Sequence, residues 1–177
     1  RKSYFYPDLP KNFQISQYQQ PLAAHGRVAI ANHEIRIRRV HLEEDTGKLL
    51  HDAQNGTRSK IDFNRAGIPL IEIVTEPDIE NPEEAERFLQ HIKRILSYLA
   101  VSDCSMEEGS LRCDANLSVR KNEKEPLGTK TEIKNLNSFK SVRKALAYET
   151  QRQRTLLEQE NVVRQETRLW DDKAQIT

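Results

Sequence analysis

The sequence of 177 residues has few of the features that build the commonest nucleotide-binding, nucleophilic and zinc sites. It has only 6 glycines, and no P-loop, Gly-rich dinucleotide loop or kinase HRD/DFG set occurs, so a phosphate cradle built from backbone amides is not expected. No GxSxG elbow supports a nucleophilic triad. Cys104 and Cys113 form no CxxC motif, which argues against a zinc site and a disulfide framework.

The chain also lacks a strong net charge and long apolar runs. Its 28 basic and 27 acidic residues leave a net charge of +1, which argues against a polybasic nucleic-acid module. No signal peptide, transit peptide or apolar run of membrane length is present. Hydrophobic residues make up 36%, below the roughly half that is usual, so we expect an extended surface or a partner. The chain begins at Arg1 rather than Met, and we expect a piece of a longer protein.

One stretch, Leu111 to Arg120, alternates without a break between apolar and polar residues, as a half-buried strand does. Its polar face is unusual because it sets a carboxylate and an amide between two guanidiniums, and such a row could hold metal ions and phosphate oxygens. On this strand alone, a charged surface face is the favoured alternative. The polar face consists of Arg112, Asp114, Asn116, Ser118 and Arg120.

Acids also occur on or beside three further strands that the sequence predicts. Ile35 to Asp45 reads as a strand with a bulge near Arg38, and it ends in three acids, Glu43 to Asp45, for which a solvated turn is the alternative to a ligand role of Glu44. Residues 61–65 and 70–76 read as two strands joined by a turn. In the second of these, Glu72 is flanked by aliphatic residues. A buried lone carboxylate costs several kcal/mol unless it is paired or metal-bound, so Glu72 is a candidate site residue.

Two helices are predicted. Asn81 caps the first, Pro82 takes its first position, and an apolar stripe follows at helical spacing. The stripe consists of Ala85, Phe88, Leu89, Ile92, Ile95, Leu96 and Leu99. Ser138 caps the second helix, which runs to about Gln159. Its buried side is interrupted at Glu149 and Gln153, and its apolar members are Phe139, Val142, Ala145, Leu146 and Leu156.

A charged hairpin loop at residues 121–128 connects the opening strand to a returning strand, residues 129–136. In that hairpin Glu132 and Lys134 share a face that adjoins Asp114 and Arg112. Residues 163–170 are a last strand candidate. Two strands and a helix are thus followed by two strands and a helix, and we predict an α+β fold with helices on one side of a mostly antiparallel sheet.

The acids indicate a chemistry of divalent cations and phosphates. Magnesium prefers carboxylate oxygens and keeps substrate phosphates among its ligands, and phosphoryl transfer needs little more than metals and positioned cations. The candidate ligands are Glu44, Glu72, Asp114 and Glu132, and the candidate phosphate-neutralising cations are Arg112, Lys134, Lys48 and Arg120.

The chain resembles the B subunits of the aspartyl/glutamyl-tRNA amidotransferases over nearly its whole length. The motifs occur in the family's order, and several are long and idiosyncratic. They are Arg1 to Pro10, Gln14 to Tyr18, His41 to Asp45, Asn64 to Gly67, Glu72 to Asp78, Met106 to Arg120, Glu132 to Ser138 and Gln165 to Arg168.

The resemblance implies a ligase that forms a carbon–nitrogen bond with glutamine as amido donor. The B subunit of this family phosphorylates the side-chain carboxylate of a misacylated Glu-tRNA or Asp-tRNA with ATP, and ammonia then displaces the phosphate. The A subunit, an amidase (glutaminase), makes the ammonia, which passes through a channel, and the small C subunit straps the other two together. The resemblance further implies a catalytic cradle related to glutamine synthetase and the guanido kinases, and a bacterial cytoplasmic protein, with mitochondrion or chloroplast as the alternative.

The family's functional residues map onto the candidate acids. Glu44 and Glu72 match the catalytic magnesium site, and Asp114 and Glu132 match a second divalent-ion site. Lys2 and Lys11 match basic residues near the channel exit and the reaction centre. Arg112 and Lys134, because of their positive charge, are our candidates for contact with the nucleotide phosphates.

We expect residues 1–177 to be one catalytic domain, truncated at both ends and inactive when isolated. The expected truncation removes the family's opening segment and its helical and tail domains that bind tRNA. The alternatives are a non-catalytic RNA- or partner-binding fragment, and another ATP-dependent ligase or kinase of the same fold.

Overall fold

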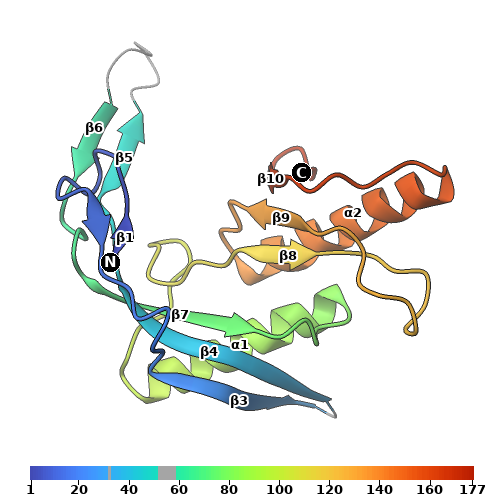
Figure 1. Ribbon diagram of the computed structural model, residues 1–177, viewed down its shortest axis with the longest axis horizontal. Coiled ribbons are helices and arrows are strands. Elements are labelled where there is room, and N and C mark those ends of the chain that lie inside the picture. The colour runs from blue at the N-terminus through green and yellow to red at the C-terminus, as the bar shows by residue number, and fades with distance from the viewer. Residues whose placement is uncertain (32, 52–58) are drawn as a thin grey trace. The chain divides into compact units, whose positions relative to one another are not determined.

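The computed structural model describes residues 1–31, 33–51 and 59–177, which form two compact units, Arg1–Asp78 and Ile79–Thr177 (Figure 1). Antiparallel strand pairs and two helices confirm the predicted α+β class. The expectation that residues 1–177 are one catalytic domain stays a prediction. Neither helix in the described residues is long and apolar enough to span a membrane.

A three-stranded antiparallel sheet is the centre of the first unit. β4 (His33–Glu44) pairs with β3 (Ala23–Ile30) on one side and with β7 (Pro69–Thr75) on the other. The pairing of β4 with β7 shifts between Ile37 and Arg39, which confirms the bulge predicted near Arg38.

Two small antiparallel sheets complete the first unit: β1 (Lys2–Ser3) with β2 (Phe13–Gln14), and β5 (Lys48–His51) with β6 (Ser59–Asp62). The strand predicted at residues 61–65 is observed as β6 and ends earlier, at Asp62. A turn begins there, in which Asn64 N donates to the Asp62 carboxylate. β6 pairs with β5 and β7 pairs with β4, so these two consecutive strands do not pair with each other.

A three-stranded sheet in the order β10-β9-β8 lies in the second unit. β8 (Ala115–Leu117) pairs antiparallel with β9 (Thr131–Lys134), which confirms the predicted hairpin. The regular strand is shorter than the predicted Leu111 to Arg120 because only three of its residues pair with β9, although burial still alternates from Leu111 to Leu117. β10 (Thr167–Leu169) runs parallel to β9, so this sheet is mixed.

Two helices, α1 (Pro82–Tyr98) and α2 (Phe139–Glu158), begin at the predicted caps. The Asn81 side chain accepts a hydrogen bond of 2.9 Å from Glu84 N, and the Ser138 hydroxyl accepts one of 3.0 Å from Ser141 N. Each cap satisfies a backbone donor that has no partner within its own helix.

The core of the second unit gathers apolar residues of both helices and of β9. α2 packs against β8, and the helices pack against each other (Figure 1). The α1 stripe is buried at Phe88 and Ile92 but largely exposed at Leu99, so the predicted stripe is wrong for its last turn. The core consists of Ala85, Ile133, Leu136, Val142, Ala145, Leu146 and Trp170.

Replacing Asn81 by Ala removes the acceptor for Glu84 N. We expect Asn81→Ala to lower the free energy of unfolding by about 1 kcal/mol, because a backbone donor at the start of α1 loses its partner. Urea unfolding measures the change. Gln90→Ala, an exposed change within the same helix, is the control, and a loss no larger than that of the control would contradict the capping role.

Candidate functional site

Three side chains meet on one face of the sheet in the first unit. The pairing of β4 with β7 sets His41 directly opposite Glu72, and Glu43, two residues along β4, points to the same face. His41 Nε2 lies 3.1 Å from Glu43 Oε1 and 3.1 Å from Glu72 Oε2. The strand register thus creates a His41–Glu43–Glu72 cluster.

The cluster combines a fully buried imidazole with one half-exposed acid. The His41 side chain is 0% exposed, and its Nδ1 has no hydrogen-bond partner among the described residues. Glu72 is 46% exposed, so the expectation of a carboxylate enclosed by aliphatic side chains is wrong. The pleat turns its side chain away from Ile71 and Ile73 towards His41.

The donor atoms of the cluster fit one divalent ion. One ligand atom from each of the three side chains lies within 4.8 Å of the others. Carboxylate oxygens suit magnesium and manganese, and an imidazole nitrogen is accepted by manganese more readily than by magnesium. Gln14 Nε2 and Ser16 Oγ also donate to the Glu43 carboxylate, which fixes its orientation.

Glu44 lies on the opposite face of β4 from Glu43. Its carboxylate binds Lys11 Nζ at 2.5 Å and accepts a hydrogen bond of 2.9 Å from Ile15 N. The Ile15 N–H and the Lys11 ammonium hold the pKa of the Glu44 carboxyl below its ordinary value. The structure therefore brings Glu44 to Lys11 and does not bring it to Glu72.

A second cluster joins three residues of the β8–β9 hairpin. Lys134 Nζ lies 2.9 Å from Asp114 Oδ2 and 3.5 Å from Glu132 Oε1, as the predicted shared face requires. The hydrogen bond to Asp114 raises the pKa of the Lys134 ammonium. The two carboxylates thus already share one cation, and the ammonium shows that a positive charge is accommodated between them.

The other cations that the sequence assigns to phosphate or to the channel lie at the protein surface. Arg112 and Lys48 are exposed, and Arg120 donates to the backbone oxygen of Glu125 in the hairpin loop. Lys2 lies exposed in β1.

Sequence reasoning does not single out His41 and Glu43 as site residues. Glu43 reads only as part of an acidic turn, and His41 only as part of a motif. The sequence feature that could have identified them is their spacing of two residues, which places His41 and Glu43 on the same face of a strand. This spacing predicts a site only once Glu72 is known to lie opposite His41.

Comparisons with known proteins match the whole chain. Residues 1–177 match the family described as the GatB/GatE catalytic domain. The aspartyl/glutamyl-tRNA(Asn/Gln) amidotransferase B subunit of Carboxydothermus hydrogenoformans is 54% identical over 183 residues, which cover 100% of this chain and 38% of that protein. The same subunit of Caldicellulosiruptor bescii is 57% identical over 176 residues, 97% of this chain and 36% of that protein. The chain thus spans about 38% of the length of such relatives.

Removal of the Lys11 ammonium tests what stabilises the charge of Glu44. We expect Lys11→Met to raise the pKa of the Glu44 carboxyl towards its ordinary value, because the carboxylate loses its ion pair while keeping the Ile15 N–H. A carbon-detected NMR titration of the side chain measures this pKa. Lys2→Met is the matched control, and an equal pKa in both variants would show that Lys11 does not act on Glu44.

Proposed function

The chain belongs to the GatB/GatE catalytic domain family, and on that premise we propose that it is part of the B subunit of a glutamine-dependent tRNA amidotransferase. The match over residues 1–177 carries this proposal. The alternative of a non-catalytic RNA- or partner-binding fragment is not favoured, because the matching family is described as a catalytic domain.

The proposed reaction is the amidation of misacylated Glu-tRNA or Asp-tRNA. ATP phosphorylates the side-chain carboxylate, and ammonia then displaces the phosphate to give Gln-tRNA or Asn-tRNA. Both ATP and the carboxylate are anions, so their approach has to be offset by positive charge. The chain supplies acids that can hold divalent cations and ammonium groups that can face phosphate oxygens.

The two clusters are the proposed cation positions. His41, Glu43 and Glu72 would hold one ion, and Asp114 and Glu132 would hold another after Lys134 turns away. A bound divalent ion supplies charge that offsets the repulsion between the phosphate and the carboxylate. Lys134 has a long flexible side chain, and its ammonium, released from Asp114, is then free to contact a phosphate oxygen.

Further parts of the proposal rest on the resemblance of the motifs. The motif match proposes Glu44 as a ligand of the catalytic ion, although in this structure its carboxylate lies on the opposite face of β4 from Glu43 and is neutralised by Lys11, so Glu44 would join that ion only after the end of β4 rearranges. Lys11 and Lys2 are proposed to lie near the exit of the ammonia channel, and Arg112, because of its positive charge, to contact the nucleotide.

The parent protein is proposed to use magnesium and ATP and to work in the bacterial cytoplasm as a heterotrimer with an amidase (A) and a small strap (C) subunit. Its fold is proposed to be a cradle like that of glutamine synthetase and the guanido kinases.

A substitution at Glu72 tests the proposed function in the full-length protein with its partner subunits. We expect Glu72→Gln to slow the ATP- and ammonia-dependent conversion of Glu-tRNA to Gln-tRNA by about 100-fold, because one ligand of the proposed ion is lost. Quantifying Gln-tRNA over time measures the rate.

Glu34→Gln is the matched control, since Glu34 is an exposed acid of β4 that pairs with Arg27 far along the strand from His41. Equal rates for Glu72→Gln and Glu34→Gln would rule out the proposed role of Glu72.

A further inference from the structure

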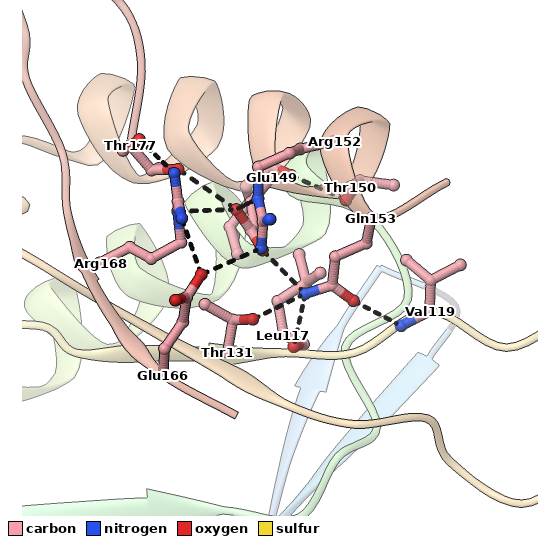
Figure 2. Close-up of polar contacts among 11 residues, drawn as sticks. Leu117, Val119, Thr131, Glu149, Thr150, Arg152, Gln153, Glu166, Arg168 and Thr177 are labelled. Carbon is pink, nitrogen blue, oxygen red and sulfur yellow. Dashed lines mark hydrogen bonds and ion pairs between the residues drawn. The ribbon is translucent and has the colours of Figure 1, made fainter. Parts of the chain in front are cut away.

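A buried carboxylate on α2 is the centre of a polar network in the second unit (Figure 2). The Glu149 side chain is 0% exposed, and Arg152 binds both of its oxygens at 2.7 and 2.8 Å. Gln153 Nε2 donates to Glu149 Oε1 at 2.9 Å, and Thr177 Oγ1 donates to Glu149 Oε2 at 3.2 Å. Burial alone raises the pKa of the Glu149 carboxyl, but the hydrogen bonds from Arg152 and Gln153 outweigh burial and leave the pKa below its ordinary value.

Gln153 connects this carboxylate to both strands of the β8–β9 hairpin. Its Nε2 lies 3.2 Å from Leu117 O and 3.2 Å from Thr131 Oγ1, and these residues are partners at one end of the β8–β9 ladder. Its Oε1 accepts a hydrogen bond of 3.2 Å from Val119 N. One amide group therefore bonds to β8, to β9 and to the segment where the chain leaves β8.

Arg168 connects the same carboxylate to β10, on the other side of β9. Arg168 Nε lies 3.7 Å from Glu149 Oε2, and Arg168 also donates to Thr177 and to Glu166 (Figure 2). The residue before Arg168 reaches the candidate site directly, because Thr167 Oγ1 donates to Glu132 Oε2 at 2.8 Å.

The network thus contacts both neighbours of β9, the strand that carries Glu132 and Lys134. Thr131 is fully buried towards α2, and alternation along β9 puts Glu132 on the opposite face. Any shift of β9 relative to β8 changes the distances from Asp114 to Glu132 and Lys134.

Stability alone gives little reason for this arrangement. Replacing a buried ion pair by packed apolar residues of similar volume is often neutral or stabilising, so burying Glu149 with Arg152 is a weak means of holding α2 to the sheet. A buried hydrogen-bonded network is satisfied in only one geometry, and in some proteins such a network sets the register of the elements that it joins.

We propose that Glu149 is a positioning residue for the Asp114–Glu132–Lys134 cluster, acting through Gln153 on β8 and β9 and through Arg168 on β10. The inference rests on the proposed function, in which Asp114 and Glu132 bind a divalent ion. Glu149 acts from the α2 side of the sheet and does not contact the ion. It sets the positions of the Asp114 and Glu132 carboxylates.

The test uses the full-length protein in its complex and Mn²⁺ alone as the probe. The Mn²⁺ site in question is the one that Glu132→Gln disrupts. We expect Glu149→Gln to raise the Mn²⁺ dissociation constant of that site by about 10-fold, as loss of a residue that supports metal ligands does. Electron paramagnetic resonance of free Mn²⁺ measures binding without any turnover. Hydrogen exchange at Thr131 to Lys134 is expected to become faster in the same variant.

Glu86→Gln is the matched control, since Glu86 forms an ion pair of 3.2 Å with Arg143 that joins α2 to α1 rather than to the strands. Gln153→Met is the second variant, because it keeps the length of the side chain and removes its bonds to Leu117 and Thr131. It is expected to weaken the same Mn²⁺ site.

The outcomes separate the inference from the proposed function. No change in Mn²⁺ binding on Glu132→Gln would overturn the proposed second ion. Weaker binding in Glu132→Gln with unchanged binding in Glu149→Gln and Gln153→Met would overturn the positioning role alone. Equal weakening by Glu86→Gln, or loss of folding in both network variants, would make the role of the network purely structural and overturn the proposal as well.

Discussion

The register of paired strands decides which acids of this chain can meet. In the first unit, the alignment of β4 with β7 sets Glu72 opposite His41, and the alternation of side chains adds Glu43 while it turns Glu44 to the other face. In the second unit, the hairpin register sets Glu132 opposite Asn116, and Lys134 contacts both Glu132 and Asp114. Because a slip by one residue would reverse every face, both proposed ion positions depend on these alignments.

The second cluster could be predicted from the sequence and the first could not, for a physical reason. Glu132 lies on β9 and Asp114 immediately before β8, and these two strands follow each other directly in the sequence, so one chain segment defines both the pairing and the face. Glu72 lies on a strand whose partner is distant in the sequence and contains a bulge at Arg38, and a bulge changes the parity of all residues beyond it. The motif resemblance pairs Glu44 with Glu72, but only the register shows which side chains face His41.

The interruption of the second helix has a similar explanation. Glu149 and Gln153 read as breaks in an apolar stripe because periodicity along one helix counts only apolar residues. Both side chains are fully buried. Their partners outside the helix, Leu117, Thr131 and Arg168, come from three different strands, so periodicity along the helix does not reveal them. A polar residue at a buried helical position therefore indicates a network rather than a weaker helix. The network lies on the side of β9 opposite Glu132, which connects the packing of α2 to the proposed site.

Each of the two clusters that strand register defines is proposed to be a divalent-ion position. Anomalous diffraction from crystals of the full-length protein soaked in Mn²⁺ tests this proposal most directly. One manganese peak is expected with Glu72 and either Glu43 or His41 as ligands, and a second with Asp114 and Glu132 as ligands and Lys134 turned away. Manganese found only elsewhere, with His41 still bonded to Glu72 and Lys134 still bonded to Asp114, would contradict the proposal.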